Sequence, residues 1–200
     1  MKFKNEKGFF DHTQVEKIEQ IQANKYIEAN CVVLELGGRY GTVSCVISKK
    51  LSYPLNLVVV EPDERVWDVL EENMIANDCI FHIVKGFVSN SPLGLTELES
   101  FDRYGTTSIK SESSTIKSYT LNEIETMYNL KFNTLVADCE GFLEQFFDEY
   151  PHLYEQLFLV LFEKDAPHKC NYDKIKENLR LHGFESIGTE SYWHEVWRKL

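Results

Sequence analysis

Short apolar runs recur along the chain and are separated by segments with helical periodicity. The runs at 31–36, 55–60, 80–84, 133–138 and 157–162 have the length and composition of buried parallel strands. Around them, apolar positions repeat with helical spacing, and the expected helices cover 13–27, 42–51, 64–76, 121–128, 141–150 and 172–182. Strands that alternate with helices predict an α/β fold, in which a mostly parallel sheet has helices on both faces.

Polar and glycine positions set the expected ends of these elements. Thr13 and Asp63 are the expected N-caps of two helices, and Gly183 is the expected C-cap of a third. The segment 87–118 is rich in Ser, Thr and Gly, which predicts a hairpin and an irregular loop. The runs at 184–187 and 195–198 are expected to pair as a C-terminal antiparallel hairpin.

The length of 200 residues suits a single domain. We expect an N-terminal helical extension over 1–29 and a Rossmann-like core over 30–200. No apolar run approaches 18 residues and the first residues lack the pattern of a signal peptide, so we expect a cytoplasmic protein with no membrane span. The sequence leaves open the alternative that the chain is one domain of a larger glycan-modifying protein.

The net charge and the cysteine content limit the classes of ligand and partner that we expect. The formal net charge of −11 disfavours nucleic acid, because an anionic surface repels phosphate backbones. The five cysteines are odd in number and show no CxxC spacing, which favours reduced, buried thiols over metal ligands or disulfides.

A glycine-rich turn follows the first expected strand, and an acidic residue follows the second. Glycines allow a sharp turn and a close approach of the backbone to a ligand. An acid at the end of the next strand can accept hydrogen bonds from ribose hydroxyls. The two features together predict a nucleoside-type cofactor held by Glu35, Gly37, Gly38, Arg39, Tyr40, Gly41, Glu61 and Pro62.

The spacing of the glycines distinguishes between two such cofactors. Dinucleotide sites favour G-x-G-x-x-G, which binds a pyrophosphate at a helix N-terminus. Here the pattern is Glu-x-Gly-x-x-x-Gly, and the anionic Glu35 would repel a pyrophosphate. The anionic Glu35 suits a cofactor with an ammonium and a sulfonium group. We therefore expect S-adenosyl-L-methionine, with S-adenosyl-L-homocysteine as the product. A nicotinamide oxidoreductase is the less favoured alternative.

Three motifs resemble those of the FkbM-type methyltransferases. They are Glu-Leu-Gly-Gly-Arg-Tyr-Gly at 35–41, Val-Glu-Pro at 60–62 and Asp-Cys-Glu-Gly at 138–141, and the resemblance extends over about residues 30–185. It implies the Rossmann-like class I methyltransferase fold and methylation of hydroxyl oxygens on sugars, glycolipids or polyketides. The chain departs from the family pattern at Gly38-Arg39, where Ala-Asn is common, and at Leu143, where a Glu is expected.

Carboxylates gather where methyl transfer would occur. Asp138, Glu140 and Glu163 follow two strands that we expect to be neighbours, and clustered carboxylates raise one another's pKa, which favours a general base. We predict Asp138 as the base or acceptor-orienting residue, with Glu140 and Glu163 in support. Alternatively, these acids cap the following helices, or hold a divalent metal. Because no spacing demands a metal, we assign none.

Other polar and aromatic residues have two interpretations each. The Tyr192-Trp193-His194 cluster and Trp197 suit core or hairpin packing, or an aromatic platform for a sugar ring. His168 suits an exposed loop or the acceptor site, and 106–108 suits a loop or a hydrogen-bonding contact. The predicted function is O-methyl transfer to a sugar, glycan or other small hydroxylated acceptor. The alternative is a non-catalytic S-adenosylmethionine-binding module with a regulatory or structural role.

Overall fold

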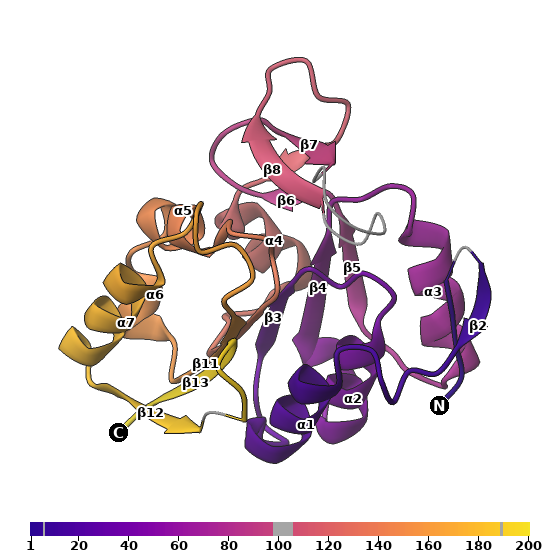
Figure 1. Cartoon of the computed structure of the whole chain (residues 1–200), viewed down its shortest axis with the longest axis horizontal. Helices are drawn as coiled ribbons and strands as arrows, with labels where there is room; N and C mark the ends of the chain where they lie inside the picture. The colour runs from indigo at the N-terminus through magenta and orange to yellow at the C-terminus, as the bar shows by residue number, and fades with distance from the viewer. Residues whose placement is uncertain (6, 98–105, 189) are drawn as a thin grey trace.

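The computed structural model has three layers, with a central sheet between two layers of helices (Figure 1). It describes residues 1–5, 7–97, 106–188 and 190–200. The strands are β1 (Phe3–Asn5), β2 (Gly8–Phe10), β3 (Val33–Leu36), β4 (Leu57–Glu61), β5 (His82–Lys85), β6 (Phe87–Val88), β7 (Leu93–Glu97), β8 (Thr106–Lys110), β9 (Ser118–Tyr119), β10 (Thr134–Ala137), β11 (Leu159–Glu163), β12 (Phe184–Gly188) and β13 (His194–Lys199). The helices are α1 (Lys17–Tyr26), α2 (Thr42–Lys50), α3 (Trp67–Ala76), α4 (Leu121–Tyr128), α5 (Leu143–Glu149), α6 (Leu153–Gln156) and α7 (Tyr172–Leu181), with a 3₁₀ turn η1 (Pro54–Asn56).

Within the described residues, seven strands form the central sheet in the order β12-β13-β11-β10-β3-β4-β5. The strands β11, β10, β3, β4 and β5 pair in parallel, and β13 is antiparallel to both of its neighbours. This confirms the predicted α/β fold, with its mostly parallel sheet and C-terminal antiparallel hairpin.

Both faces of the sheet are buried, which explains the nearly continuous apolar runs of its strands. Alternate residues of a strand point to opposite faces, so Leu34 and Leu36 pack with α4, α5, α6 and α7. Val33 points the other way and packs with α1, α2 and α3. In Figure 1, α5, α6 and α7 lie on the left of the view, whereas α1 and α2 lie low at the front.

The strand order reverses at β3: β4 and β5 follow on one side of it, and the later strands β10 and β11 lie on its other side. This strand has β4 on one side and β10 on the other, and backbone hydrogen bonds continue past its end: Gly37 N donates to Val60 O, and Asp138 N donates to Leu36 O. In open α/β sheets, ligands bind outside the carboxyl ends of the strands at such a switch point. The β7–β8 hairpin stands above this edge of the sheet, at the top of Figure 1.

Two of the predicted helix caps are wrong. Helix α1 begins at Lys17, with Glu16 at the N-cap in the left-handed region, while Thr13 donates both its N–H and its hydroxyl to Asp11. Helix α3 begins after Val66, and the Asp63 carboxylate accepts hydrogen bonds from Arg65 instead of capping. In both places the expected capping residue is engaged in a local hydrogen bond, and neither helix has a side-chain N-cap. Gly183 does follow the end of α7 with a positive φ, as predicted.

The N-terminal extension contains a β1–β2 hairpin that the sequence pattern did not predict. It is held partly by side chains, since the backbone of Lys4 exchanges hydrogen bonds with Asn73 on α3. Strands of three residues carry too little alternation to be recognised. The irregular loop expected within 87–118 falls partly on residues 98–105, which lie outside the described residues, whereas the expected hairpin there is β7–β8. No helix in the described part of the chain has both the length and the apolar character to cross a membrane.

Candidate functional site

A cavity of about 280 Å³ lies at the carboxyl ends of β3, β4, β10 and β11. Its volume is near the lower end of the range for small-molecule sites. It is also bordered by α1 and by Thr106 and Ser108 of β8. The predicted site residues that line it are Gly37, Arg39, Glu61, Pro62, Asp138, Glu140 and Glu163. The structure thus brings the predicted cofactor side and the predicted acceptor side into one cavity.

The turn after β3 approaches β10 closely. Gly37 has φ +88°, and a Cβ atom at this position would lie 1.8 Å from the carbonyl oxygen of Asp138. Arg39 also has a positive φ, of 40°. A larger residue at position 37 would push the two strand ends apart, so this glycine serves the close approach as well as the turn.

Three predicted cofactor residues shape this turn without lining the cavity. Gly38 packs against Val59, where a Cβ would lie 2.2 Å from Cγ1. Tyr40 is buried with its ring 5.7 Å from that of Phe10, and Gly41 is the N-cap of α2. Direct contact of Gly38, Tyr40 or Gly41 with a cofactor stays a prediction.

The carboxylate of Glu61 is buried and oriented by two backbone donors. Arg39 N donates to Oε2 and Asp63 N donates to Oε1, each at 2.7 Å, and the side chain is only 5% exposed. Each oxygen keeps a further lone pair, because an ionised carboxylate offers about four acceptor positions. Burial raises the pKa of Glu61 to about 7, against the lowering effect of the two N–H donors. The arrangement suits a ligand with two adjacent hydroxyls.

Glu35 lies on β3 beneath the turn and is 2% exposed. Its Oε2 atom has no hydrogen-bond partner in the described structure. Burial raises the pKa of Glu35 to about 8, and the charges of Glu16 and Glu61 add to this effect. Glu35 borders a smaller cavity that it shares with Gly37 and Asp138, beside the main one. A cation placed near this oxygen would relieve an unfavourable burial.

On the predicted acceptor side, Asp138 directly follows β10 and Glu163 is the last residue of the neighbouring β11, as predicted. Burial, followed by the charges of Glu163 and Asp165, raises the pKa of Asp138 well above its usual range. Burial also raises the pKa of Glu163 to about 8 and that of Glu140 to about 7. The cavity therefore gathers carboxyl groups that bind protons more tightly than ordinary ones.

Asp165 fixes the loops around these acids. Its Oδ2 accepts the backbone N–H of Glu140 at 2.6 Å, and its Oδ1 accepts the hydroxyl of Tyr172 at 2.6 Å. Glu140 itself has a positive φ of 49°. Asp165 thus ties the turn after β10 to the start of α7, beside the predicted acceptor residues.

Two acids that line the cavity come from the N-terminal segment, in which the sequence predicted no site residue. Glu16 accepts a hydrogen bond from the Thr42 hydroxyl, and burial raises its pKa to about 7. Glu19 lies one turn further along α1. On an amphipathic helix, such acids are expected to face solvent, so the sequence offered no signal for them.

The aromatic cluster near the C-terminus is divided between the core and the surface. Trp197 is buried, whereas Tyr192 is 78% exposed. Tyr192 and Trp193 border a separate hollow that also includes His168, and none of these three lines the main cavity. Trp197 therefore packs in the core, and the exposed aromatics lie outside the candidate site.

Comparison with known proteins identifies the fold. No family model matches the chain, and neither does any curated protein. Among solved structures, the chain is similar to a precorrin-6y C5,15-methyltransferase from Geobacter metallireducens (TM-score 0.55, 12% identity, 93% of this chain and 89% of that one). It is also similar to a ribosomal protein L11 methylase from Lactobacillus delbrueckii (0.54, 15%, 96% and 81%) and to an rRNA methylase from Streptococcus thermophilus (0.55, 4%, 92% and 95%). At these identities, the similarity shows that the chain has the Rossmann-like fold of such methyltransferases.

Proposed function

We propose that this protein is an S-adenosylmethionine-dependent methyltransferase that transfers a methyl group to a hydroxyl of a small molecule or glycan. The observation that carries the proposal is the carboxylate of Glu61, held by two backbone N–H groups at the switch point of the sheet, with an acceptor position left on each oxygen. This is where a ribose binds in nucleotide-binding folds of this type. The resemblance to the FkbM-type methyltransferases supports the choice of a hydroxyl acceptor.

The residues present fit the charge of the cofactor. S-adenosylmethionine carries a ribose diol, an ammonium and a sulfonium. The diol can donate hydrogen bonds to Glu61. The positive groups suit the Oε2 atom of Glu35, which has no hydrogen-bond partner among the described residues. They also suit the acids that line the cavity, which are Glu16, Glu19, Asp138 and Glu163. A dinucleotide would instead bring a pyrophosphate against these carboxylates, which Coulomb repulsion disfavours.

When bound, the cofactor supplies a methyl group on a positively charged sulfur. In the free protein, burial and the charges of Glu163 and Asp165 raise the pKa of Asp138 well above its usual range, which favours the protonated form. A positive charge nearby favours the ionised carboxylate, which can then accept the proton of an acceptor hydroxyl. Glu140 and Glu163 would hold the acceptor oxygen in line, and the β7–β8 hairpin would limit the access of water.

The net charge of the protein, more than its fold, supports the proposed class of methyl acceptor. The structural neighbours are named for methylation of a precorrin, a ribosomal protein and rRNA, so the fold is compatible with several acceptors. The net charge of −11 favours a small molecule or glycan over RNA. We place the reaction in the cytoplasm, with S-adenosylhomocysteine as the second product.

Calorimetry with S-adenosylmethionine, S-adenosylhomocysteine and NAD tests the cofactor. We expect the first two to bind and NAD to bind far more weakly; tighter binding of NAD would overturn the proposal. A second measurement follows S-adenosylhomocysteine production with a panel of monosaccharides and oligosaccharides. Turnover with a hydroxylated acceptor supports the enzyme. Tight cofactor binding without turnover on any acceptor favours a non-catalytic binding module.

A further inference from the structure

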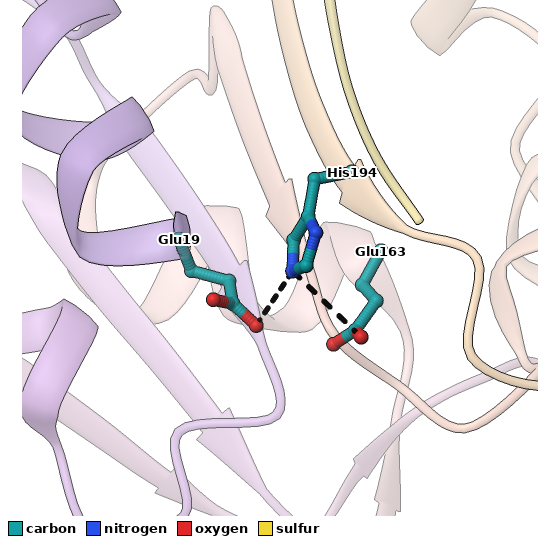
Figure 2. Close-up of side chains that lie close together, drawn as sticks. All are labelled: Glu19, Glu163 and His194. Atoms are coloured by element: carbon teal, nitrogen blue, oxygen red, sulfur yellow. Dashed lines mark ion pairs between the residues drawn. The ribbon is translucent and has the colours of Figure 1, made fainter. Parts of the chain in front are cut away.

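Three side chains from distant parts of the sequence converge beside the cavity. Figure 2 shows Glu19 of α1 and Glu163 at the end of β11 on either side of His194, which begins β13. The Nε2 atom of His194 lies 3.0 Å from Oε1 of Glu19 and 3.7 Å from Oε1 of Glu163. The three potential ligand atoms all lie within 4.8 Å of one another.

The imidazole of His194 is buried without a hydrogen bond at Nε2. The residue is 8% exposed, and Nε2 has no hydrogen-bond partner in the described part of the chain. The Oε1 atoms of Glu19 and Glu163 pair with this nitrogen as ion pairs, which require a protonated ring. With a neutral ring protonated at Nδ1, Nε2 and the two ionised carboxylates are all acceptors, and a buried nitrogen left unsatisfied in this way points to a missing ligand.

The other ring nitrogen is already held. Nδ1 of His194 is hydrogen-bonded to the hydroxyl oxygen of Ser191, which also accepts the backbone N–H of Trp193 at 3.2 Å. If Nδ1 donates its proton to Ser191, the lone pair of Nε2 is directed between Glu19 and Glu163. Histidines that ligate metals usually donate their second N–H in this way, which fixes both tautomer and ring orientation.

The separations match those of ligands around a small dication. Metal–ligand distances of about 2.0–2.2 Å place two ligands roughly 3.0–3.5 Å apart. The observed 3.0 and 3.7 Å bracket this range. Two carboxylates close together in a buried site also repel one another, and the same cavity holds Glu16 and Asp138. A divalent cation bound here would compensate the charge of these carboxylates when they are ionised.

We propose that Glu19, Glu163 and His194 bind a divalent first-row transition-metal ion such as Zn²⁺ or Mn²⁺. An imidazole nitrogen favours these ions over Mg²⁺ and Ca²⁺, which prefer oxygen ligands alone. Three protein ligands leave coordination positions open, as in catalytic metal sites. Because Glu19 and Glu163 line the main cavity, the open positions face it. Under the proposed function, an acceptor hydroxyl would occupy one of them and would be acidified there.

Calorimetry on tag-free, chelator-treated protein tests the site, with ZnCl₂, MnCl₂ and MgCl₂ as titrants. We expect one Zn²⁺ or Mn²⁺ per chain and much weaker binding of Mg²⁺. His194→Ala and Glu19→Gln should each weaken binding at least about tenfold, and Ser191→Ala, which keeps all three ligands, by about ten- to hundredfold. His168→Ala, at an exposed loop histidine, is the matched control and should leave the affinity unchanged.

Equal affinity of the parent protein and His194→Ala would overturn the site, as would tighter binding of Mg²⁺ than of Zn²⁺ and Mn²⁺. If a ligand variant fails to fold, Co²⁺ added to the parent protein decides the matter. Visible absorption that Zn²⁺ abolishes supports the site, and its absence overturns it. Binding of S-adenosylhomocysteine is measured separately with and without metal. Its failure would reject the proposed function while leaving the metal result intact, so the two outcomes are distinguishable.

Discussion

The carbonyl oxygen of Asp138 lies 1.8 Å from the place where a Cβ atom of Gly37 would stand. The end of β10 therefore closes directly on the turn that follows β3. This contact unites the two halves of the candidate site, because the turn carries the predicted cofactor residues and Asp138 is the predicted base. The geometry of the site depends on one position that has no side chain.

Gly37→Ala should therefore lower the free energy of unfolding by more than backbone strain alone would. We expect a loss of about 2–4 kcal/mol, which combines a left-handed alanine with a steric clash. Gly183→Ala is the matched control, since Gly183 has a similar φ of +82° and nothing within 4 Å of its Cβ position. That variant should lose only about 1–2 kcal/mol. Urea unfolding measures both, and equal losses would show that the close approach contributes nothing.

Glu61→Gln should weaken binding of S-adenosylhomocysteine. Removal of the charge weakens hydrogen bonds that are worth about 1.5–3 kcal/mol when one partner is ionised, so the affinity should fall roughly ten- to hundredfold. Glu64→Gln makes the same chemical change at an exposed neighbouring position and should bind like the parent protein. Calorimetry gives the affinities, and thermal unfolding checks that the variant is folded. An unchanged dissociation constant would exclude Glu61 from the site.

Asp138→Asn keeps the shape of the side chain and removes its ability to accept a proton. We expect the methylation rate to fall by about 10²–10⁴ while cofactor affinity stays within a few-fold. Asp148→Asn, on the exposed surface of α5, is the control. Single-turnover kinetics with a reactive acceptor provide the rate. Near-full activity of Asp138→Asn would mean that orientation of the acceptor suffices and that this carboxylate is structural.

The stability of the ligand-free protein should fall as the pH rises from about 5 to 8. Burial raises the pKa of Glu16 and Glu61 to about 7 and that of Glu35 to about 8. The folded protein keeps these protons at pH values where the unfolded chain, with pKa values near 4.5, has released them. Folding therefore takes up protons, and stability decreases with pH across this window.

Thermal unfolding at several pH values without ligand measures this effect. Glu35→Gln, which stays neutral, should reduce the slope because it removes one of the groups that titrate. A melting temperature that rises between pH 5 and 8 would contradict the assignment of these carboxyl groups as protonated in the folded state.

The sequence predicted the architecture well because the strands are buried on both faces. Apolar runs such as 31–36 and 157–162, when helical segments separate them, indicate buried parallel strands and are compatible with few other folds. The least predictable parts were governed by single side chains. Glu16 takes the N-cap in place of Thr13, and a three-residue strand pair forms against the side chain of Asn73. Such choices are decided by tertiary contacts rather than by local pattern.

The sequence placed most of the predicted cofactor residues correctly at the edge of the sheet, but it did not predict the part of the cavity wall that comes from α1. Glu61 is the last residue of β4, so its place at the sheet edge comes from strand order alone. Glu19 lies on a helix in the N-terminal extension, and His194 lies in a cluster that reads equally well as hairpin packing. Nothing in sequence spacing connects these two residues. Only the packing of α1 against β11 and β13 brings them together.

The contribution of α1 to the cavity has a consequence for folding. Glu16 and Glu19 form one wall, and Glu19 is held by His194 of the last strand, so the wall exists only once α1 and β13 have both docked. A partly folded form with either element detached offers a ligand an incomplete surface. Binding to the finished state alone stabilises it by RT ln(1 + [L]/Kd). Occupancy of the cavity should therefore shield the first helix and the last strand from proteases together, as one cooperative unit.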